Sequence, residues 1–472
     1  MKRRNFIMNA GILSAGYALS PSLSFALPSD FPVVRVAKEL RNFSSVAVEN
    51  AIEKFSKGVK NKELVWLFQN CFPNTLDTTV TYNLVDGKPD TYVITGDIDA
   101  MWLRDSSAQV WPYLQFVNQD KKIKDLIHGV INRQTQCVLK DPYANAFYND
   151  PNKAGEWASD LTDMKKGVHE RKWEIDSLCY TIRLAYHYWK ATGDASSFGK
   201  EWVNAIKLIL QTFKEQQRKE NKGPYSFQRE TAKATDTLPM NGFGYPVKPV
   251  GLICSSFRPS DDATVFSFLI PSNFFAVVSL QQASEMIRQI AKDNNLADQL
   301  MSLSNEVKTA LAKYAVVKHP KYGDVYAFEV DGFGNALMMD DSNVPSLLSL
   351  PYLGAISNSD ATYINTRKMV LSDANPFYFS GSAAKGIGGP HAGQDMIWPM
   401  SLIIQALTSN QTSEIKECIA TLQRTHANTG FMHESFHKDN PKNFTRPWFA
   451  WANTLFGELL WKTYHEHPEL LS

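Results

Sequence analysis

The sequence predicts an all-α protein whose helices form an (α/α)6 barrel, or toroid. Apolar residues recur at helical spacing in about a dozen segments, and long polar loops follow alternate helices. Strand-like stretches are few and short, so the β–α alternation of a doubly wound sheet or a TIM barrel is missing. A solenoid is the competing layout, but the sequence shows no fixed repeat period.

The elements follow in order along the chain. The predicted helices span 46–57, 62–71, 105–118, 121–139, 173–192, 196–219, 272–294, 297–314, 344–350, 359–370, 393–408, 412–426 and 447–464. The predicted strands span 78–84, 91–95 and 325–330. Loops 96–105, 140–176, 225–262, 317–343, 374–398 and 428–446 are long and carry polar and aromatic residues. In a toroid these loops converge at one mouth.

The length and composition of the chain are sufficient for one large hydrophobic core. The chain has 472 residues, of which 44% are hydrophobic, and a formal net charge of +1. We expect a single catalytic domain over 30–472 and a monomer, without an internal linker. A near-neutral charge predicts no general attraction to nucleic acid or to an anionic membrane. No later segment is apolar for long enough to insert the mature chain into a membrane.

The N-terminus is typical of an export signal. Lys2, Arg3 and Arg4 form a basic head before an apolar stretch at 6–19 and small residues at 24–26. We expect a cleaved signal peptide over 1–26 and a periplasmic protein, and the arginine pair is compatible with the twin-arginine route. A membrane anchor is the alternative, but polar residues interrupt the short apolar stretch.

The cysteines predict no metal site. They are scattered, odd in number and without C-x-x-C spacing. The five are Cys71, Cys137, Cys179, Cys254 and Cys418. Buried free thiols are expected, and one disulfide remains open for an oxidising compartment.

The run 96–106 contains the first candidate binding residues. Trp102 offers a flat apolar face to a sugar ring, and Arg104 with Asp105 presents hydrogen-bonding groups for vicinal hydroxyls. Alternatively, Asp105 caps the following helix while Arg104 pairs with a carboxylate. The spacing of Asp97 and Asp99 also matches the D-x-D of glycosyltransferases, but the nucleotide-binding sheet that those enzymes require is not predicted.

The run 257–263 contains adjacent carboxylates. Asp261 and Asp262 should repel each other, which tends to raise the pKa of one of them. A carboxyl that stays protonated near neutral pH suits a general acid. The alternative is a loop or helix cap with Arg258 as counter-ion.

Two further runs add candidates. Glu434 follows Phe431 and Met432, where burial without a partner or a task would be costly. His433 and His437 have helical zinc spacing, but a Lys-Asp-Asn-Pro segment follows and no H-E-x-x-H motif is present.

The glycine-rich run 386–399 allows close approach of the backbone to a ligand. His391 and Gln394 add hydrogen-bonding groups there, and Trp398 adds a stacking face. A buried histidine with Asp395 as a cap is the alternative. A lesser candidate is Asp176 in the run 172–177, which is equally suited to cap a helix or to bind a ligand.

Together, these runs resemble glycoside hydrolase family 125, the exo-acting α-1,6-mannosidases of bacteria and fungi. The resemblance covers essentially the whole mature chain, in order. The matching runs are GDIDAMWLRDSSAQVWPYL, WEIDSLCYTIRLAYHYW, FRPSDDA, IPSN, EVDGFGN, MDDSNVPSLL, GGPHAGQDMIWPM and GFMHESF. It implies an (α/α)6 barrel and hydrolysis with inversion, without a metal or other cofactor. The Trp-x-Arg-Asp element also looks like the sugar clamp of glucoamylases.

The resemblance implies roles for single residues. The general acid falls on Asp261, with a one-residue ambiguity toward Asp262, and the general base falls on Glu434. The sugar-binding side chains would be those of Trp102, Arg104, Asp105, Arg258, His391, Gln394 and Trp398.

The expected function is removal of terminal α-1,6-linked mannose from an oligosaccharide or N-glycan. Three alternatives remain at this level. They are a related exo-glycosidase of the same barrel type, such as a glucosidase, a glycan-binding protein without catalysis, and a sugar-nucleotide transferase.

Overall fold

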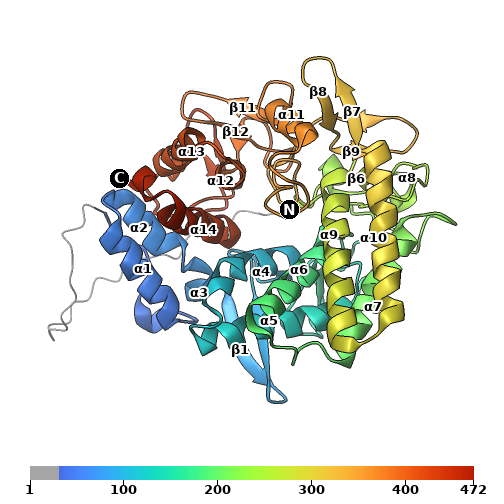
Figure 1. The fold of residues 1–472 in the computed structure, drawn as a ribbon, viewed down its shortest axis with the longest axis horizontal. Helices are drawn as coiled ribbons and strands as arrows, with labels where there is room; N and C mark the ends of the chain where they lie inside the picture. The colour runs from blue at the N-terminus through green and yellow to red at the C-terminus, as the bar shows by residue number, and fades with distance from the viewer. Residues whose placement is uncertain (1–30) are drawn as a thin grey trace. The chain divides into compact units, whose positions relative to one another are not determined.

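The computed structural model describes residues 31–472, so the predicted signal peptide at 1–26 lies outside the described residues. Residues 34–472 form one unit, coloured from blue to red in Figure 1. Its α-helices are α1 (Val46–Gly58), α2 (Lys62–Cys71), α3 (Asn74–Thr78), α4 (Leu103–Val110), α5 (Lys121–Lys140), α6 (Ile175–Thr192), α7 (Lys200–Gln216), α8 (Pro239–Gly242), α9 (Ile270–Met286), α10 (Asn294–Tyr314), α11 (Ala361–Val370), α12 (Pro399–Leu407), α13 (Thr412–Thr425) and α14 (Ala450–Glu466). Short 3-10 turns are η1 (Lys38–Leu40), η2 (Trp111–Phe116), η3 (Ala234–Asp236) and η5 (Pro468–Leu471), and η4 (Ile287–Ala291) is a π-helical turn.

The strands are short and form small antiparallel sheets. The two-stranded sheets are β1 (Val80–Val85) with β2 (Lys88–Val93), β7 (Val316–His319) with β8 (Gly323–Tyr326), and β11 (Tyr378–Ser380) with β12 (Lys385–Ile387). The three-stranded sheets, each in spatial order, are β3 (Met101–Trp102), β4 (Ala146–Phe147) and β5 (Val168–Glu170); β10 (Ala336–Leu337), β9 (Glu329–Val330) and β6 (Phe268–Leu269); and β13 (Met396–Ile397), β14 (Ser435–His437) and β15 (Phe444–Thr445).

The helices form an inner and an outer ring, the (α/α)6 arrangement that the sequence predicts (Figure 1). The inner helices α4, α6, α9, α12 and α14 are buried on nearly all sides; every residue of α4 is buried. The outer helices α5, α7, α10 and α13 bury one face and expose the other. Successive helices therefore alternate between a buried environment and a half-solvated one, as a double ring requires.

One place in the inner ring is filled without a helix. The predicted helix at 344–350 is wrong, because side chains take the backbone groups that a helix would use. The Asp340 carboxylate accepts hydrogen bonds from the backbone N–H groups of Leu347 and Leu348, at 2.8 and 3.0 Å. This segment still contacts the inner helix α6, since the Tyr180 hydroxyl donates to the carbonyl of Val344 at 3.0 Å.

The other predicted helices are confirmed, with shifts at some ends. The helix predicted to start at 393 begins at Pro399, because Met396 and Ile397 pair with β14 as a strand instead. The predicted helix 105–118 changes to a 3-10 turn at Trp111, where Pro112 follows. Of the predicted strands, the first two form the β1–β2 hairpin, and 325–330 divides between β8 and β9.

Three inner helices begin directly after a two-residue strand. β3 leads into α4, β6 into α9 and β13 into α12, and each strand pairs with strands from the long loops. The loops are therefore hydrogen-bonded to the N-terminal ends of the inner helices. Side chains at these ends are held by both the helix and the sheet.

All five cysteines are buried free thiols, as expected from their scattered positions. Within residues 31–472, no helix is both long and apolar enough to cross a membrane.

The ring closes where α14 packs tightly against Phe72, the residue that follows α2. A Cβ atom at Gly457 would lie 2.7 Å from the Cα of Phe72. We expect Gly457→Ala to lower the free energy of unfolding by about 1–3 kcal/mol, because the backbones must separate. Denaturant unfolding measures the effect. Gly199→Ala is the control, since a Cβ there meets nothing within 4 Å; equal losses in both variants would contradict the prediction.

Candidate active site

The long loops meet one another at the end of the ring where the inner helices begin. Ser260 donates to Asp341 at 3.0 Å, and the backbone N–H of Ser342 donates to Gly388 at 3.1 Å. Arg446 binds Asp97, joining the last loop to the first. The predicted convergence of the loops is thus confirmed by side-chain and backbone contacts between them.

Arg104 lies at the centre of this region, in the first turn of α4. Its Nη1 donates to Glu174 at 2.7 Å and to Asp176 at 3.2 Å, both at the start of α6. Its Nη2 donates to Asp261 at 3.3 Å, and its Nε lies 3.5 Å from Asp105. Both Nη atoms are therefore directed at carboxylates. This is the ion-paired alternative foreseen for Arg104.

Asp261 extends from a tight turn toward Arg104. Its backbone has a φ of 65°, and its carbonyl oxygen accepts from Lys172 Nζ at 2.9 Å. Its carboxylate also accepts from Asn145 Nδ2 at 3.3 Å. The side chain is 23% exposed, whereas that of Glu174 beside it is fully buried. Asp261 is the member of the Arg104 cluster that reaches accessible space.

Asp262 points to different partners. Its Oδ1 lies 3.3 Å from Lys233 Nζ and 3.6 Å from His391 Nδ1. Burial works to raise the pKa of Asp262, but the hydrogen bond and charge of His391, with the charge of Lys233, lower it. The pKa of Asp261 is also lowered. The predicted rise of a pKa through repulsion between these neighbours is therefore wrong, because the turn sends the two side chains to separate cations.

The raised pKa values belong to carboxyls on the inner helices. Burial raises the pKa of Asp105 and of Asp176 to about 6, although the charge of Arg104 opposes it. Burial also raises the pKa of Glu174 well above its usual range. For Asp261 burial acts in the same direction, but the charges of Arg104 and Lys172 outweigh it and lower the pKa.

Glu434 has a different environment. One carboxylate oxygen lies 3.3 Å from Arg446 Nη1, and the other accepts from the Thr445 hydroxyl at 2.9 Å. Arg446 in turn binds Asp97. The Glu434 side chain is only 7% exposed, and it lies just before β14. Its burial is therefore compensated by an ion pair and a hydrogen bond.

His391 interacts electrostatically with the carboxylates of both Asp262 and Glu434. Burial works to lower its pKa, but the hydrogen bond with Asp262 and the charges of Asp262 and Glu434 raise it above the ordinary value. The same histidine contributes to lowering the pKa of Asp261. His391 also packs edge-on against Trp398, at 6.1 Å between ring centroids. The 386–399 loop thus brings His391 and Trp398 to the site.

The remaining candidates differ in position. Trp102 is buried at the N-terminus of α4, with its ring edge-on to His169 at 5.1 Å. Gln394 is exposed on the loop. Arg258 is ion-paired, because its Nε donates to the fully buried Glu329 at 2.6 Å. Glu329 also accepts from the backbone N–H groups of Val265 and Phe266, so Arg258 braces its own loop.

Several buried polar atoms at this end of the ring have no hydrogen-bond partner in the described part of the protein. They are Trp102 Nε1, Arg104 Nε, Asp262 Oδ2, Trp398 Nε1 and Trp448 Nε1. Buried polar groups are normally hydrogen-bonded, and leaving one unpaired costs about 1–3 kcal/mol. Such groups beside aromatic rings suit a ligand with many hydroxyls.

The positions of Asp97, Asp99 and His433 do not support a glycosyltransferase D-x-D site or a zinc site. Asp97 is bound to Arg446, and the Asp99 side chain is 75% exposed. The ring of His433 stacks on Phe444 at 3.7 Å. Among residues 31–472, no group of three or more histidine, cysteine, aspartate or glutamate side chains is placed to hold a metal ion.

Comparison with known proteins identifies a family for this chain. Residues 61–461 match the family of metal-independent α-mannosidases, glycoside hydrolase family 125. This chain belongs to that family. It is therefore a glycoside hydrolase and an α-mannosidase.

Individual relatives extend the comparison. The meiotically up-regulated gene 157 protein of Schizosaccharomyces pombe is 42% identical over 463 residues, 94% of this chain and 91% of the relative. A metal-independent α-mannosidase of Streptococcus pneumoniae, solved in a non-productive complex with α-1,6-mannobiose, is also 42% identical. The match covers 90% of this chain and 100% of that one, with a TM-score of 0.86. The glucoamylase of Saccharomycopsis fibuligera shares the fold, at 11% identity and a TM-score of 0.51, over 91% of this chain and 99% of that one.

Sequence reasoning missed residues that the structure places here. Glu174, Asn145 and Arg446 all contact a predicted catalytic carboxylate or the arginine beside it. Glu174 lies in the run that drew attention to Asp176, so its proximity to Asp176 was a usable signal. Arg446 lies in the same loop as Glu434, but outside the motifs that drew attention to it.

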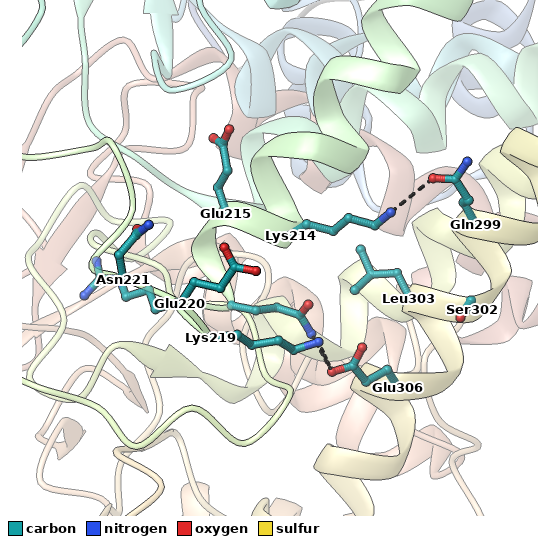
Figure 2. A pocket seen from close by; sticks show the side chains of 11 residues that line it. Lys214, Glu215, Lys219, Glu220, Asn221, Gln299, Ser302, Leu303 and Glu306 are labelled. Atoms are coloured by element: carbon teal, nitrogen blue, oxygen red, sulfur yellow. Dashed lines mark hydrogen bonds and ion pairs between the residues drawn. The ribbon is translucent and has the colours of Figure 1, made fainter.

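A separate hollow of about 430 Å³ lies on the outer ring, between the end of α7 and the face of α10 (Figure 2). Its two lysines are already engaged: Lys214 donates to Gln299 at 3.1 Å, and Lys219 pairs with Glu306 at 2.6 Å. None of the described residues that line it is aromatic. The hollow does not have the features of a sugar site.

The position of Arg258 generates a stability prediction. Arg258→Met should lower the free energy of unfolding by about 3–5 kcal/mol, because Glu329 would stay buried and unpaired. Thermal or denaturant unfolding measures the loss. Adding Glu329→Gln should restore part of it, since the uncompensated charge disappears. Unchanged stability with weaker substrate binding would instead support direct sugar contact by Arg258.

Proposed function

We propose that this protein is an inverting exo-α-1,6-mannosidase, with Asp261 as general acid and Glu434 as general base. The observation that carries the proposal is the contrast between the surroundings of the two carboxylates. Asp261 lies in a cluster where carboxylates outnumber the arginine that they contact, whereas Glu434 has Arg446 as its own partner. A cluster with more carboxylates than cations favours a retained proton, which a general acid needs, whereas a carboxylate with an arginine of its own suits a general base.

The reaction uses both carboxyls at once. Asp261 donates a proton to the glycosidic oxygen as its bond to the anomeric carbon breaks, and the bond's electron pair stays with that oxygen. Glu434 takes a proton from a water molecule that attacks the anomeric carbon from the opposite face. The product is β-mannose, and the developing positive charge on the sugar is stabilised by the surrounding carboxylates.

The choice of Asp261 over Asp262 is supported by exposure and contacts. Asp261 is 23% exposed and held by Arg104, whereas Asp262 is 1% exposed and engaged by Lys233 and His391. Asp262 then serves to orient His391 toward the sugar. Trp102 and Trp398 supply apolar surface and indole N–H donors for it.

The substrate and its linkage are inferred from the family and the relative. The Streptococcus pneumoniae enzyme was solved with α-1,6-mannobiose, which supports an α-1,6-linked mannoside as substrate here. The unpartnered indole and guanidinium donors at the site support a polyhydroxylated ligand.

We also propose that the chain is exported to the periplasm and works as a monomer. The basic head, the apolar stretch and the small residues at 24–26 support cleavage of the signal. The single unit over 34–472 and the family match over 61–461 support one catalytic domain after it. Mass spectrometry of the exported protein and light scattering test the two points; an intact leader or a dimer would contradict them.

Linkage-defined disaccharides test the function directly. We expect hydrolysis of α-1,6-mannobiose to exceed that of α-1,2- and α-1,3-mannobiose and of isomaltose, with β-mannose as the first product by NMR. Release of α-mannose would contradict inversion. Preference for isomaltose would indicate a glucosidase, and binding without release would indicate a glycan-binding protein.

Leaving-group dependence tests the acid. We expect Asp261→Asn to lower kcat on α-1,6-mannobiose by ~10²–10⁴-fold, but far less on an aryl mannoside whose leaving group needs no protonation. Glu434→Gln should slow both substrates alike, because each needs the activated water. Asp262→Asn is the matched comparison for Asp261. An equal loss on both substrates for Asp261→Asn, with leaving-group dependence for Asp262→Asn, would move the acid to Asp262.

A further inference from the structure

The cluster around Arg104 contains more negative charge than its cation can neutralise. Four carboxyls contact this one guanidinium, those of Asp105, Glu174, Asp176 and Asp261. All but Asp261 have side chains that are 7% exposed or less. Like charges at such distances in a buried site interact strongly, so full ionisation of the cluster is unfavourable.

The second cation nearby is shared with other acids. Lys172 Nζ donates to the backbone oxygen of Asp261, and it also lies 2.6 Å from Asp236 and 3.4 Å from Glu170. Lys172 therefore offsets the excess around Arg104 only in part, because its charge is shared with Asp236 and Glu170. At least one carboxyl of the cluster must retain a proton.

Asp261 and Glu174 are the two carboxyls that are arranged to share it. Arg104 reaches Glu174 through Nη1 and Asp261 through Nη2. Asn145 Nδ2 lies 3.4 Å from Glu174 Oε1 and 3.3 Å from Asp261 Oδ1. The two carboxyls also act on each other, since Asp261 raises the pKa of Glu174 and Glu174 lowers that of Asp261.

The pair's other neighbours come from every element that packs around it. The cations and histidines are Arg104, Lys172, His169 and His391, and the further carboxyls are Asp105, Glu170 and Asp176. The charge of Asp261 acts on the pKa of His169, and the charge of His391 acts on the pKa of Asp261. The protonation states of both histidines therefore affect the Asp261–Glu174 pair.

We propose that Asp261 and Glu174 hold one proton between them, and that Glu174 is the positioning residue that keeps the general acid supplied with it. The inference rests on the proposed function and deepens it. A general acid must carry a proton, yet Arg104 and Lys172 favour the ionised form of Asp261. Glu174, fully buried behind Asp261, stores the proton that Asp261 alone would lose.

Each carboxyl returns to its initial protonation state after one turnover. Asp261 passes the shared proton to the departing oxygen, and the pair becomes doubly ionised. Repulsion between the two carboxylates then draws a proton back from solvent through the exposed edge of Asp261. Glu434 releases to solvent the proton that it took from the attacking water. Neither carboxyl forms a bond to the sugar.

The pKa directions agree with this arrangement. Burial raises the pKa of Glu174, and the Asp261 charge and hydrogen bond add to that rise. The charges of Arg104 and Lys172, together with the hydrogen bond from Glu174, lower the pKa of Asp261. Such a pair titrates as a unit, with one macroscopic step displaced to high pH.

The pH dependence of kcat/KM on α-1,6-mannobiose tests the proposal. Loss of the shared proton sets the alkaline limb. Glu174→Gln removes the neighbouring charge, so Asp261 loses its proton more readily. We expect the alkaline limb to move to lower pH by about one unit or more, with the acid limb in place. An unmoved alkaline limb in the folded variant would overturn the proposal.

Control variants separate this effect from damage to the fold. Glu458→Gln replaces another glutamate of an inner helix, bound to the Tyr352 hydroxyl at 2.9 Å. The groups that act on the pKa of Glu458 include Arg183 and Lys462 but no member of the Arg104 cluster, so the limbs of this variant should not move. Glu174→Asp keeps a carboxyl and should recover part of the alkaline range. A Glu174→Asp profile identical to that of Glu174→Gln would also overturn the proposal.

Infrared spectroscopy gives a readout that needs neither turnover nor substrate. The wild type near pH 7 should show a protonated-carboxyl C=O band that both Asp261→Asn and Glu174→Gln remove. Asp340, whose pKa burial raises to about 8, supplies a band that stays in all three proteins. If the two variants each retain the full wild-type signal, no proton is shared. The Asp261→Asn comparison stands even if Glu174→Gln does not fold.

The general-acid role of Asp261 and the proton that it shares with Glu174 would be contradicted by different results. Full activity of Asp261→Asn on α-1,6-mannobiose would remove the proposed acid itself. An inactive Asp261→Asn together with an unmoved alkaline limb in Glu174→Gln would leave the acid in place and remove only the shared proton.

Discussion

The interaction on which the site depends is the buried ion cluster of Arg104. One guanidinium in the first turn of α4 joins the first turn of α6 to the tight turn that carries Asp261. An arginine suits this position because its planar donors can bind several carboxylates in fixed directions. Without it, four buried or half-buried carboxyls would lose their common partner. The same contacts thus hold two inner helices and one catalytic loop in register.

The double ring makes this cluster possible. Its inner helices begin at the same end, where short strands attach the long loops to them. Helix N-termini favour negative charge, so carboxylates such as Asp105 and Asp176 in first turns are stabilised there. The architecture therefore collects acidic side chains at one end of the ring. Positive partners, such as Arg446 at Glu434, then set how each carboxylate behaves.

The candidate site could be predicted where chemistry is local in the sequence. Trp102, Asp261, His391 and Glu434 all lie among the residues that meet at this end. Arg258 was a reasonable candidate by its position near Asp261 in the sequence. The structure pairs it with Glu329, which lies 71 residues away along the chain. The expected repulsion between Asp261 and Asp262 failed because a φ of 65° turns their side chains apart. Such outcomes depend on backbone direction, which residue order alone does not specify.

The sequence by itself determined the helical periodicity, the order of helices and loops, and the side chains available for chemistry. These follow from apolar spacing and local backbone preference, which neighbouring residues decide. Only the tertiary structure decided which charges face one another. It made Glu174 the partner of Asp261, gave Arg446 to Glu434 and filled one inner place with turns instead of the helix 344–350. Electrostatic energies depend on distance in space and on burial, and both arise only when segments far apart in the chain are brought together.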